Sequence, residues 1–64
     1  MEFYKNNKEI MIEKYNRTEK KYFQSIGFTE RNSILFIPMD EFKKVQLSIL
    51  KQFNLKRLRI EIKY

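Results

Sequence analysis

The sequence contains no cysteine, so neither a disulfide framework nor a thiolate metal site is available to it. It also contains no histidine, which removes the most frequent metal ligand and the most frequent general base of enzymes. We expect no signal peptide, and the sequence shows no long apolar run and no basic amphipathic helix, so we expect no membrane association. The absence of cysteine is compatible with the cytoplasmic location that we expect. These absences predict a protein with no cofactor, no metal site and no catalytic residues.

The chain is short enough that its size limits its core. We expect residues 1–64 to form one small domain, which buries only about 60% of the surface that its unfolded form exposes. Because disulfides and metals are excluded, self-association is the remaining way to add stability, and we expect a homodimer. The formal net charge of +6 favours nucleic acid or an acidic protein as the partner.

The C-terminal third has the clearest secondary-structure pattern. Polar and apolar residues alternate strictly over residues 56–64, where Leu58 and Tyr64 mark the ends of the apolar series, and this alternation is typical of a half-buried strand. Apolar residues recur at helical spacing over residues 40–53, which predicts a helix. Asp40 is placed to cap the first turn of this helix, and Asn54 is a plausible stop because asparagine tolerates the left-handed conformation.

The first 38 residues are interpreted as strands, and only one glycine and one proline interrupt the whole chain. The expected strands are residues 2–5, 8–15, 20–28 and 33–37, with turns at 6–7, 16–19 and 29–32. A helix over residues 8–21 is the competing interpretation. The sequence therefore predicts an α+β fold, an antiparallel β-β-β-β-α-β sheet with one helix packed on one face and a C-terminal strand.

The expected turns also assign side chains to the two faces of this sheet. Directly opposed residues share a face. One face then collects mainly apolar residues, with Ser25 and Gly27 leaving room for the covering helix: Phe3, Ile10, Ile12, Phe23, Ile34 and Phe36. The other face mixes aromatic, apolar, cationic and amide side chains, and no second helix is expected to cover it.

This second face is the candidate binding surface. Aromatic rings on an open sheet stack against the bases of single strands, while neighbouring cations neutralise phosphates. The expected nucleic-acid-binding residues are Tyr4, Tyr15, Arg17, Lys20, Lys21, Tyr22, Gln24, Phe28 and Arg31. Glu9 and Glu13 on the same face argue against a phosphate track at that end. The alternative is that the tyrosines serve packing or a dimer interface, and that Arg57, Arg59 and Lys63 only protect an exposed edge.

The expected element order resembles a known family. Residues 31–42 look like a last strand that runs into a helix, and residues 10–16 followed by 21–23 look like a central hairpin. Over about residues 2–53, the chain thus resembles the Pur-alpha and Whirly type of single-stranded nucleic-acid binders, which include the small transcriptional coactivators. The resemblance implies dimeric units that bind single strands on the sheet. The added strand at 56–64 departs from the family and puts its dimer geometry in doubt.

Three classes of function follow. We expect a non-enzymatic protein that binds nucleic acid, with single-stranded DNA or RNA favoured. The alternative is a small protein-binding or inhibitory factor that acts through the open sheet face or adds a strand at an edge. An enzyme is the least favoured class, although a small ribonuclease could work with arginine, lysine, tyrosine and glutamate alone.

Overall fold

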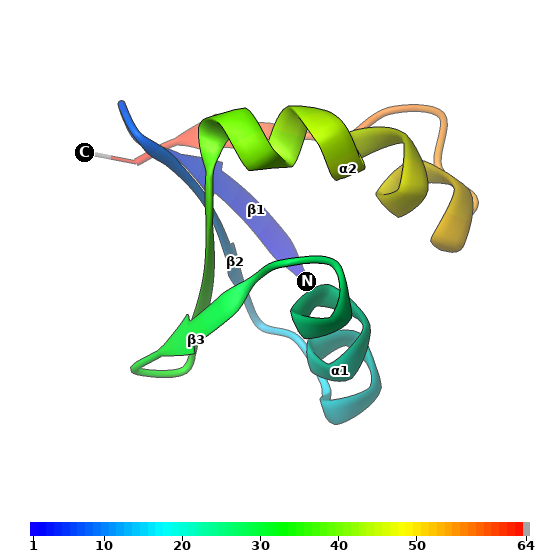
Figure 1. Ribbon diagram of the computed structural model, residues 1–64, viewed down its shortest axis with the longest axis horizontal. Coiled ribbons are helices and arrows are strands. Elements are labelled where there is room, and N and C mark those ends of the chain that lie inside the picture. The colour runs from blue at the N-terminus through cyan, green and yellow to red at the C-terminus, as the bar shows by residue number, and fades with distance from the viewer. Residues whose placement is uncertain (64) are drawn as a thin grey trace.

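The computed structural model describes residues 1–63, so the expectation for Tyr64 lies outside the described residues. The fold is α+β, as predicted, but the sheet is mixed and two helices pack on it. The elements in chain order are β1 (Glu2–Lys5), β2 (Glu9–Glu13), α1 (Arg17–Ser25), β3 (Thr29–Arg31), β4 (Ile34–Pro38), α2 (Met39–Gln52) and β5 (Ile60–Ile62). The strands lie in the order β3-β4-β2-β1-β5, and both helices cover the same face of the sheet (Figure 1).

The hairpin of β1 and β2 confirms the expected turn near Asn6. The side chain of Asn6 accepts hydrogen bonds from the backbone N–H groups of Lys8 and Glu9 at 2.8 and 2.7 Å, which closes the turn. Phe3 pairs with Ile12, whereas a turn centred on residues 6–7 would place Phe3 opposite Ile10, two residues earlier along β2. Because side chains alternate with period two, this two-residue shift keeps every side chain of the hairpin on its expected face.

The expected strand over residues 20–28 is wrong, because residues 17–25 form the helix α1. The residues interpreted as a turn are the helix start: the Asn16 side chain accepts from Glu19 N, and the Glu19 side chain accepts from Asn16 N, both at 2.8 Å. This reciprocal pair is a capping box. The helix ends at Ser25, and Gly27 follows its last turn with a φ of 120° that suits glycine, so the role of Gly27 is conformational and not to leave room under a helix.

The hairpin of β3 and β4 turns later than expected. Asn32 and Ser33 both have positive φ, at 52° and 61°, as in a two-residue type I′ turn, so Arg31 lies opposite Ile34. With β4 paired directly to β2, Leu35 and Ile37 face the helices and are fully buried. The expected faces of β4 were therefore inverted, because they had been derived from pairing with a strand at 20–28 that does not exist.

Helix α2 confirms the helix expected over residues 40–53. It begins one residue earlier than expected, at Met39, and Asp40 lies in the first turn and does not cap the helix. Pro38 occupies the cap position, and Met39 N donates to the Lys8 carbonyl at 2.9 Å. Asn54 is the predicted stop, with a φ of 53° and an N–H that donates to Lys51 O.

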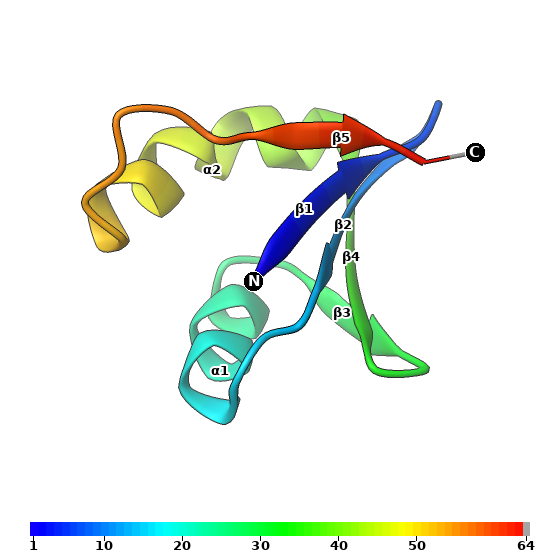
Figure 2. The same cartoon turned by 180° about the vertical axis from the view of Figure 1, so that it is seen from behind.

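The C-terminal strand is shorter than expected and runs in the other sense. Only Ile60–Ile62 form β5, and this strand pairs parallel with β1, with Phe3 opposite Ile60. Figure 2 shows the connection looping out from the end of α2 and returning to this edge strand. The antiparallel expectation for this strand is thus wrong, because α2 crosses the sheet and returns the chain to the end at which β1 begins.

The core lies between the sheet and the two helices. Its centre is Phe23 of α1, whose ring lies edge-on to Phe3 at 6.0 Å and to Phe28 at 5.1 Å, and stacked on Phe53 at 5.5 Å. Phe42 and Ile49 bring α2 onto the same cluster. The core therefore ties α1 to the C-terminal end of α2. Within residues 1–63, no helix is long and apolar enough to cross a membrane.

Candidate nucleic-acid interface

The open face is the face of the sheet opposite the helices. Its apolar side chains are covered by other side chains of the sheet. Strand alternation places Glu9, Met11 and Phe36 on this face. Arg31 reaches inward from the edge strand β3, so that its guanidinium lies 4.1 Å from the centre of the Phe36 ring and 3.2 Å from Glu9 Oε2. The ring is thus covered by a cation that a glutamate holds in place.

A second cluster of the same kind lies at the other side of the open face. Lys63 reaches inward beside β5, with its ammonium 4.8 Å from the centre of the Tyr4 ring and paired with Glu13. The Tyr4 hydroxyl donates to Glu2 at 2.9 Å, and this hydrogen bond lowers the pKa of Glu2 and raises that of Tyr4. Between the two clusters Met11 is only 8% exposed, although no helix covers it. The open face therefore needs no partner to bury its apolar centre.

A third cluster joins the start of α1 to β3. The Tyr15 hydroxyl donates to Glu30 Oε2 at 2.5 Å, and Lys20 Nζ lies 3.0 Å from Glu30 Oε1. Burial, and then the Glu30 hydrogen bond, raise the pKa of Tyr15 to about 12. The hydrogen bonds from Tyr15 and Lys20 lower the pKa of Glu30. Tyr15 and Lys20 are both expected binding residues. They interact with the same carboxylate, that of Glu30, and hold β3 against the start of α1.

The remaining expected residues do not form one surface. Phe28 is 4% exposed and belongs to the core, and the half-buried Tyr22 ring lies edge-on to Phe53 at 5.6 Å. Arg17, Lys21 and Gln24 are exposed and follow each other at intervals of four and three residues, so they form one stripe on the outside of α1. The exposed members of the expected set therefore lie in two separate places. One is this stripe on α1, and the other is the open face, with Tyr4 and Arg31.

The exposed stripe of α1 is part of a larger cationic region. Figures 1 and 2 both place α1, the last turn of α2 and the connection to β5 on the same side of the sheet, and the contact of Tyr22 with Phe53 joins them. We define the basic end as the exposed residues Arg17, Lys21, Lys51, Lys56 and Arg57. None of the five forms a salt bridge with any of residues 1–63. Their charges are available to a ligand.

The distribution of charge along the chain supports this location. Residues 16–25 and 39–59, which contain both helices and the connection, hold nine cations and three anions. The strands and turns that make up the rest hold five of each, so the helical segments carry the whole net charge of +6. Sequence reasoning left Lys51 and Lys56 out of the candidate surface and interpreted Arg57 as edge protection, although residues 51–59 hold four cations and no anion.

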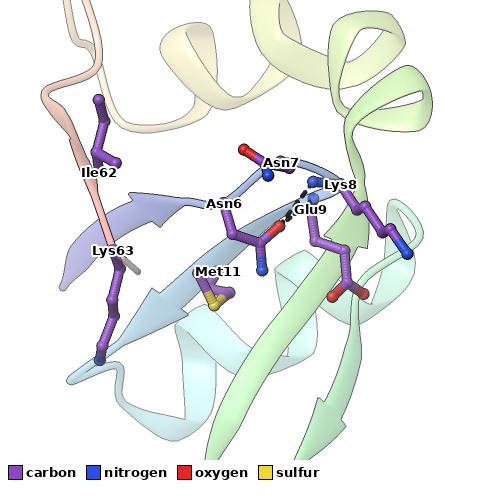
Figure 3. Close-up of a pocket in the computed structure, with 7 residues that line it drawn as sticks. All are labelled: Asn6, Asn7, Lys8, Glu9, Met11, Ile62 and Lys63. Carbon is purple, nitrogen blue, oxygen red and sulfur yellow. Dashed lines mark hydrogen bonds between the residues drawn. The ribbon is translucent and has the colours of Figure 1, made fainter.

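Two depressions flank the open face. One lies between the β1–β2 turn and the end of β5, and Figure 3 shows its lining residues: Asn6, Asn7, Lys8, Glu9, Met11, Ile62 and Lys63. These side chains offer amide and ammonium donors, with no hydroxyl, thiol or imidazole among them. The other is a groove between β1 and the connection, where Arg57 and Arg59 lie with Glu2 and Glu61. The first depression has no nucleophile–base pair, and the second extends the basic end towards β1.

Comparison of the chain with protein-family models, with curated proteins and with solved structures found no match. The resemblance to single-stranded nucleic-acid binders was based on four consecutive strands before the helix, and α1 stands in the place of the third. The function must therefore be argued from the charge and contacts of the surface.

Proposed function

We propose that this protein binds nucleic acid without catalysis, and that it does so through the basic end and not through the open face of the sheet. The observation that carries the proposal is the location of the net charge of +6 on the two helices and the connection that follows them. Lys21 and Lys51, like the rest of the basic end, have no carboxylate partner among residues 1–63. Cations of this kind release counterions from a phosphate backbone, which is the main source of non-specific affinity for nucleic acid.

The packing of the two helices also supports the basic end as the binding surface. Arg17 and Lys21 lie on a helix whose inner side is anchored by Phe23, a fully buried ring, and whose ends are closed by the Asn16 capping box and the Gly27 turn. Lys51 precedes the second helix end, which Asn54 closes in the same way. Arg17, Lys21 and Lys51 therefore lie on backbone that is already ordered, so binding costs little conformational entropy of the backbone.

The experiment compares two double variants that lose the same charge. Lys21→Gln with Lys51→Gln removes two cations of the basic end, and Lys5→Gln with Lys8→Gln removes two exposed cations from β1 and its turn. Fluorescence anisotropy with a labelled oligonucleotide measures affinity over a range of salt concentrations. We expect the first pair to reduce the salt slope by about 1 for each lysine, and to weaken binding about tenfold or more at 0.1 M salt.

The control double variant shows whether binding is located at the basic end. We expect Lys5→Gln with Lys8→Gln to change affinity by no more than about twofold, since it changes only the long-range field of the protein. Equal losses in the two pairs would mean that net charge acts without a defined site. Absence of salt-dependent binding in the wild-type protein would reject the proposed function altogether. Circular dichroism of all variants checks that each remains folded.

The edge strand β5 favours a second candidate function. Its outer side pairs with no strand among the described residues, and Ile62 there is 58% exposed. A protein partner could add a strand at this edge and cover Ile62. In that case a complex would survive nuclease treatment, and Ile62→Lys would abolish it while the basic-end variants would not.

A further inference from the structure

The aromatic rings of residues 1–63 are held in contacts that oppose stacking against bases. Phe28 and Phe23 are buried in the core, and Tyr22 packs edge-on against Phe23 at 5.4 Å and against Phe53 at 5.6 Å. Tyr15 is half-buried and tied through its hydroxyl to Glu30. A base could reach these rings only if the contact between α1 and α2 or the start of α1 were opened.

The two rings on the open face are occupied as well. The Arg31 guanidinium lies over Phe36 at 4.1 Å, and the Lys63 ammonium lies over Tyr4 at 4.8 Å. A stacked base would take the same place above each ring, and it would have to displace a cation from both the ring and a glutamate. Glu9 and Glu13, which hold these cations, would also repel the phosphates that follow.

Without stacking, a single strand loses its usual source of affinity. Base–aromatic stacking contributes about 1–3 kcal/mol for each base in proteins that bind single strands. A duplex does not depend on this contribution, and its phosphates are more densely charged, with a salt slope of about 0.9 per contact against about 0.7 for a single strand. Arg17, Lys21 and Lys51 also lie on helices packed against one core, and this fixed backbone suits a rigid polyanion.

We propose that the basic end recognises the phosphate backbone of duplex nucleic acid, in preference to single strands and without reading base sequence. The inference rests on the proposed function, because it names the ligand of the same surface. Three phosphate contacts give calculated slopes of about 2.7 and 2.1, so a duplex and a single strand that bind equally at 1 M salt differ about fourfold at 0.1 M.

The test measures both ligands side by side. A labelled duplex of mixed sequence and one of its strands, chosen to lack self-pairing, are titrated with the protein at several salt concentrations, at equal nucleotide concentration. We expect the duplex to bind about fourfold more tightly at 0.1 M salt and with the steeper slope. Equal or tighter binding of the single strand overturns the inference while the proposed function stands. No binding of either ligand rejects the proposed function itself.

Tyrosine fluorescence supplies a second readout, since the chain has four tyrosines and no tryptophan. In the variant Tyr64→Leu, only Tyr4, Tyr15 and Tyr22 contribute to it. We expect saturation with duplex to cause no strong quenching of this emission, because the contacts are made to phosphates and no base stacks on a tyrosine ring. Strong quenching on binding would show that bases stack on these tyrosines, and it would overturn the inference.

Discussion

The strands and the helices of this protein treat their charges in opposite ways. On the open face, Arg31 is held by Glu9 across β4, and Lys63 is held by Glu13 across β1, so the charge of the sheet is neutralised locally. On the helices and the connection to β5, seven of nine cations form no salt bridge among residues 1–63. A formal charge of +6 therefore describes the helical side and not the sheet. The lesson is that net charge indicates a partner only after the anions have been located.

The largest expected effect comes from the residue that fixes the helical side to the sheet. Phe23→Ala removes a fully buried ring that contacts Phe3, Phe28 and Phe53. We expect a loss of about 3–5 kcal/mol in the free energy of unfolding, which is much of the stability of so small a domain. Urea denaturation followed by circular dichroism measures it.

The matched control for Phe23→Ala also shortens an apolar side chain of a helix. Leu47 on α2 is 70% exposed, so Leu47→Ala should change the free energy of unfolding by less than about 0.5 kcal/mol. If both variants had similar small effects, α1 would not be docked on the sheet. The basic end would then have no fixed geometry, and the contrast between the two regions would disappear.

The two helices also differ in how far the sequence predicted them. Helix α2 has four apolar residues at clear helical spacing, and Asn54 marks its end, so its bounds were predicted to within one residue. Helix α1 is only nine residues long, and its apolar residues are few and mostly β-favouring aromatics. Its signals were local: Asn16 with Glu19 three residues later, and Gly27 after the last turn. Both signals also occur in turns, so periodicity over so short a segment could not decide.

The wrong strand assignment for residues 20–28 also explains why the expected binding residues do not form one surface. Seven of the nine expected binding residues lie between positions 15 and 28, which were assigned to a strand, its turn and its open face. On α1 these side chains point in different directions, so that Lys20 binds Glu30 while Arg17 and Lys21 remain exposed, and Phe28, which follows the helix, enters the core. Sequence could predict that cations gather there, but only the three-dimensional contacts show which of them have partners.

A smaller effect is expected from the start of α1. Asn16→Ala removes the acceptor for Glu19 N and half of the capping box. We expect a loss of about 1 kcal/mol in the free energy of unfolding, and Asn16→Asp should retain most of it. The control Asn7→Ala changes an exposed turn residue, and its effect should stay below about 0.5 kcal/mol. A loss for Asn7 as large as that for Asn16 would mean that the cap contributes nothing special.

A change in the open face tests whether its glutamates keep nucleic acid away. Glu9→Gln with Glu13→Gln releases Arg31 and Lys63 from their carboxylates. The pairs are at the surface, so stability should fall by only about 0.2–1 kcal/mol for each. We expect affinity for oligonucleotides to rise severalfold, with a steeper salt slope in the anisotropy assay. Unchanged affinity and slope would show that the sheet is excluded by its shape and not by its glutamates.

The smallest expected effect concerns pH and the contact between the two regions. The pKa of Tyr15 is raised from 10.0 to about 12 in the folded protein, so its contribution to stability is complete below pH 10 and is lost as the pH rises through 12. The lowered pKa of Glu30 contributes in the opposite range: this stability is present above the ordinary value of 4.5 and is lost as the pH falls below it. Tyr15→Phe should therefore reduce the fall of the urea midpoint of unfolding between pH 10 and 12, and should also weaken the dependence of that midpoint on acid pH. Identical alkaline profiles would place the Tyr15 hydroxyl in water. The start of α1 would then be held to β3 by Lys20 and Glu30 alone, and the two regions would be joined chiefly through the ring of Phe23.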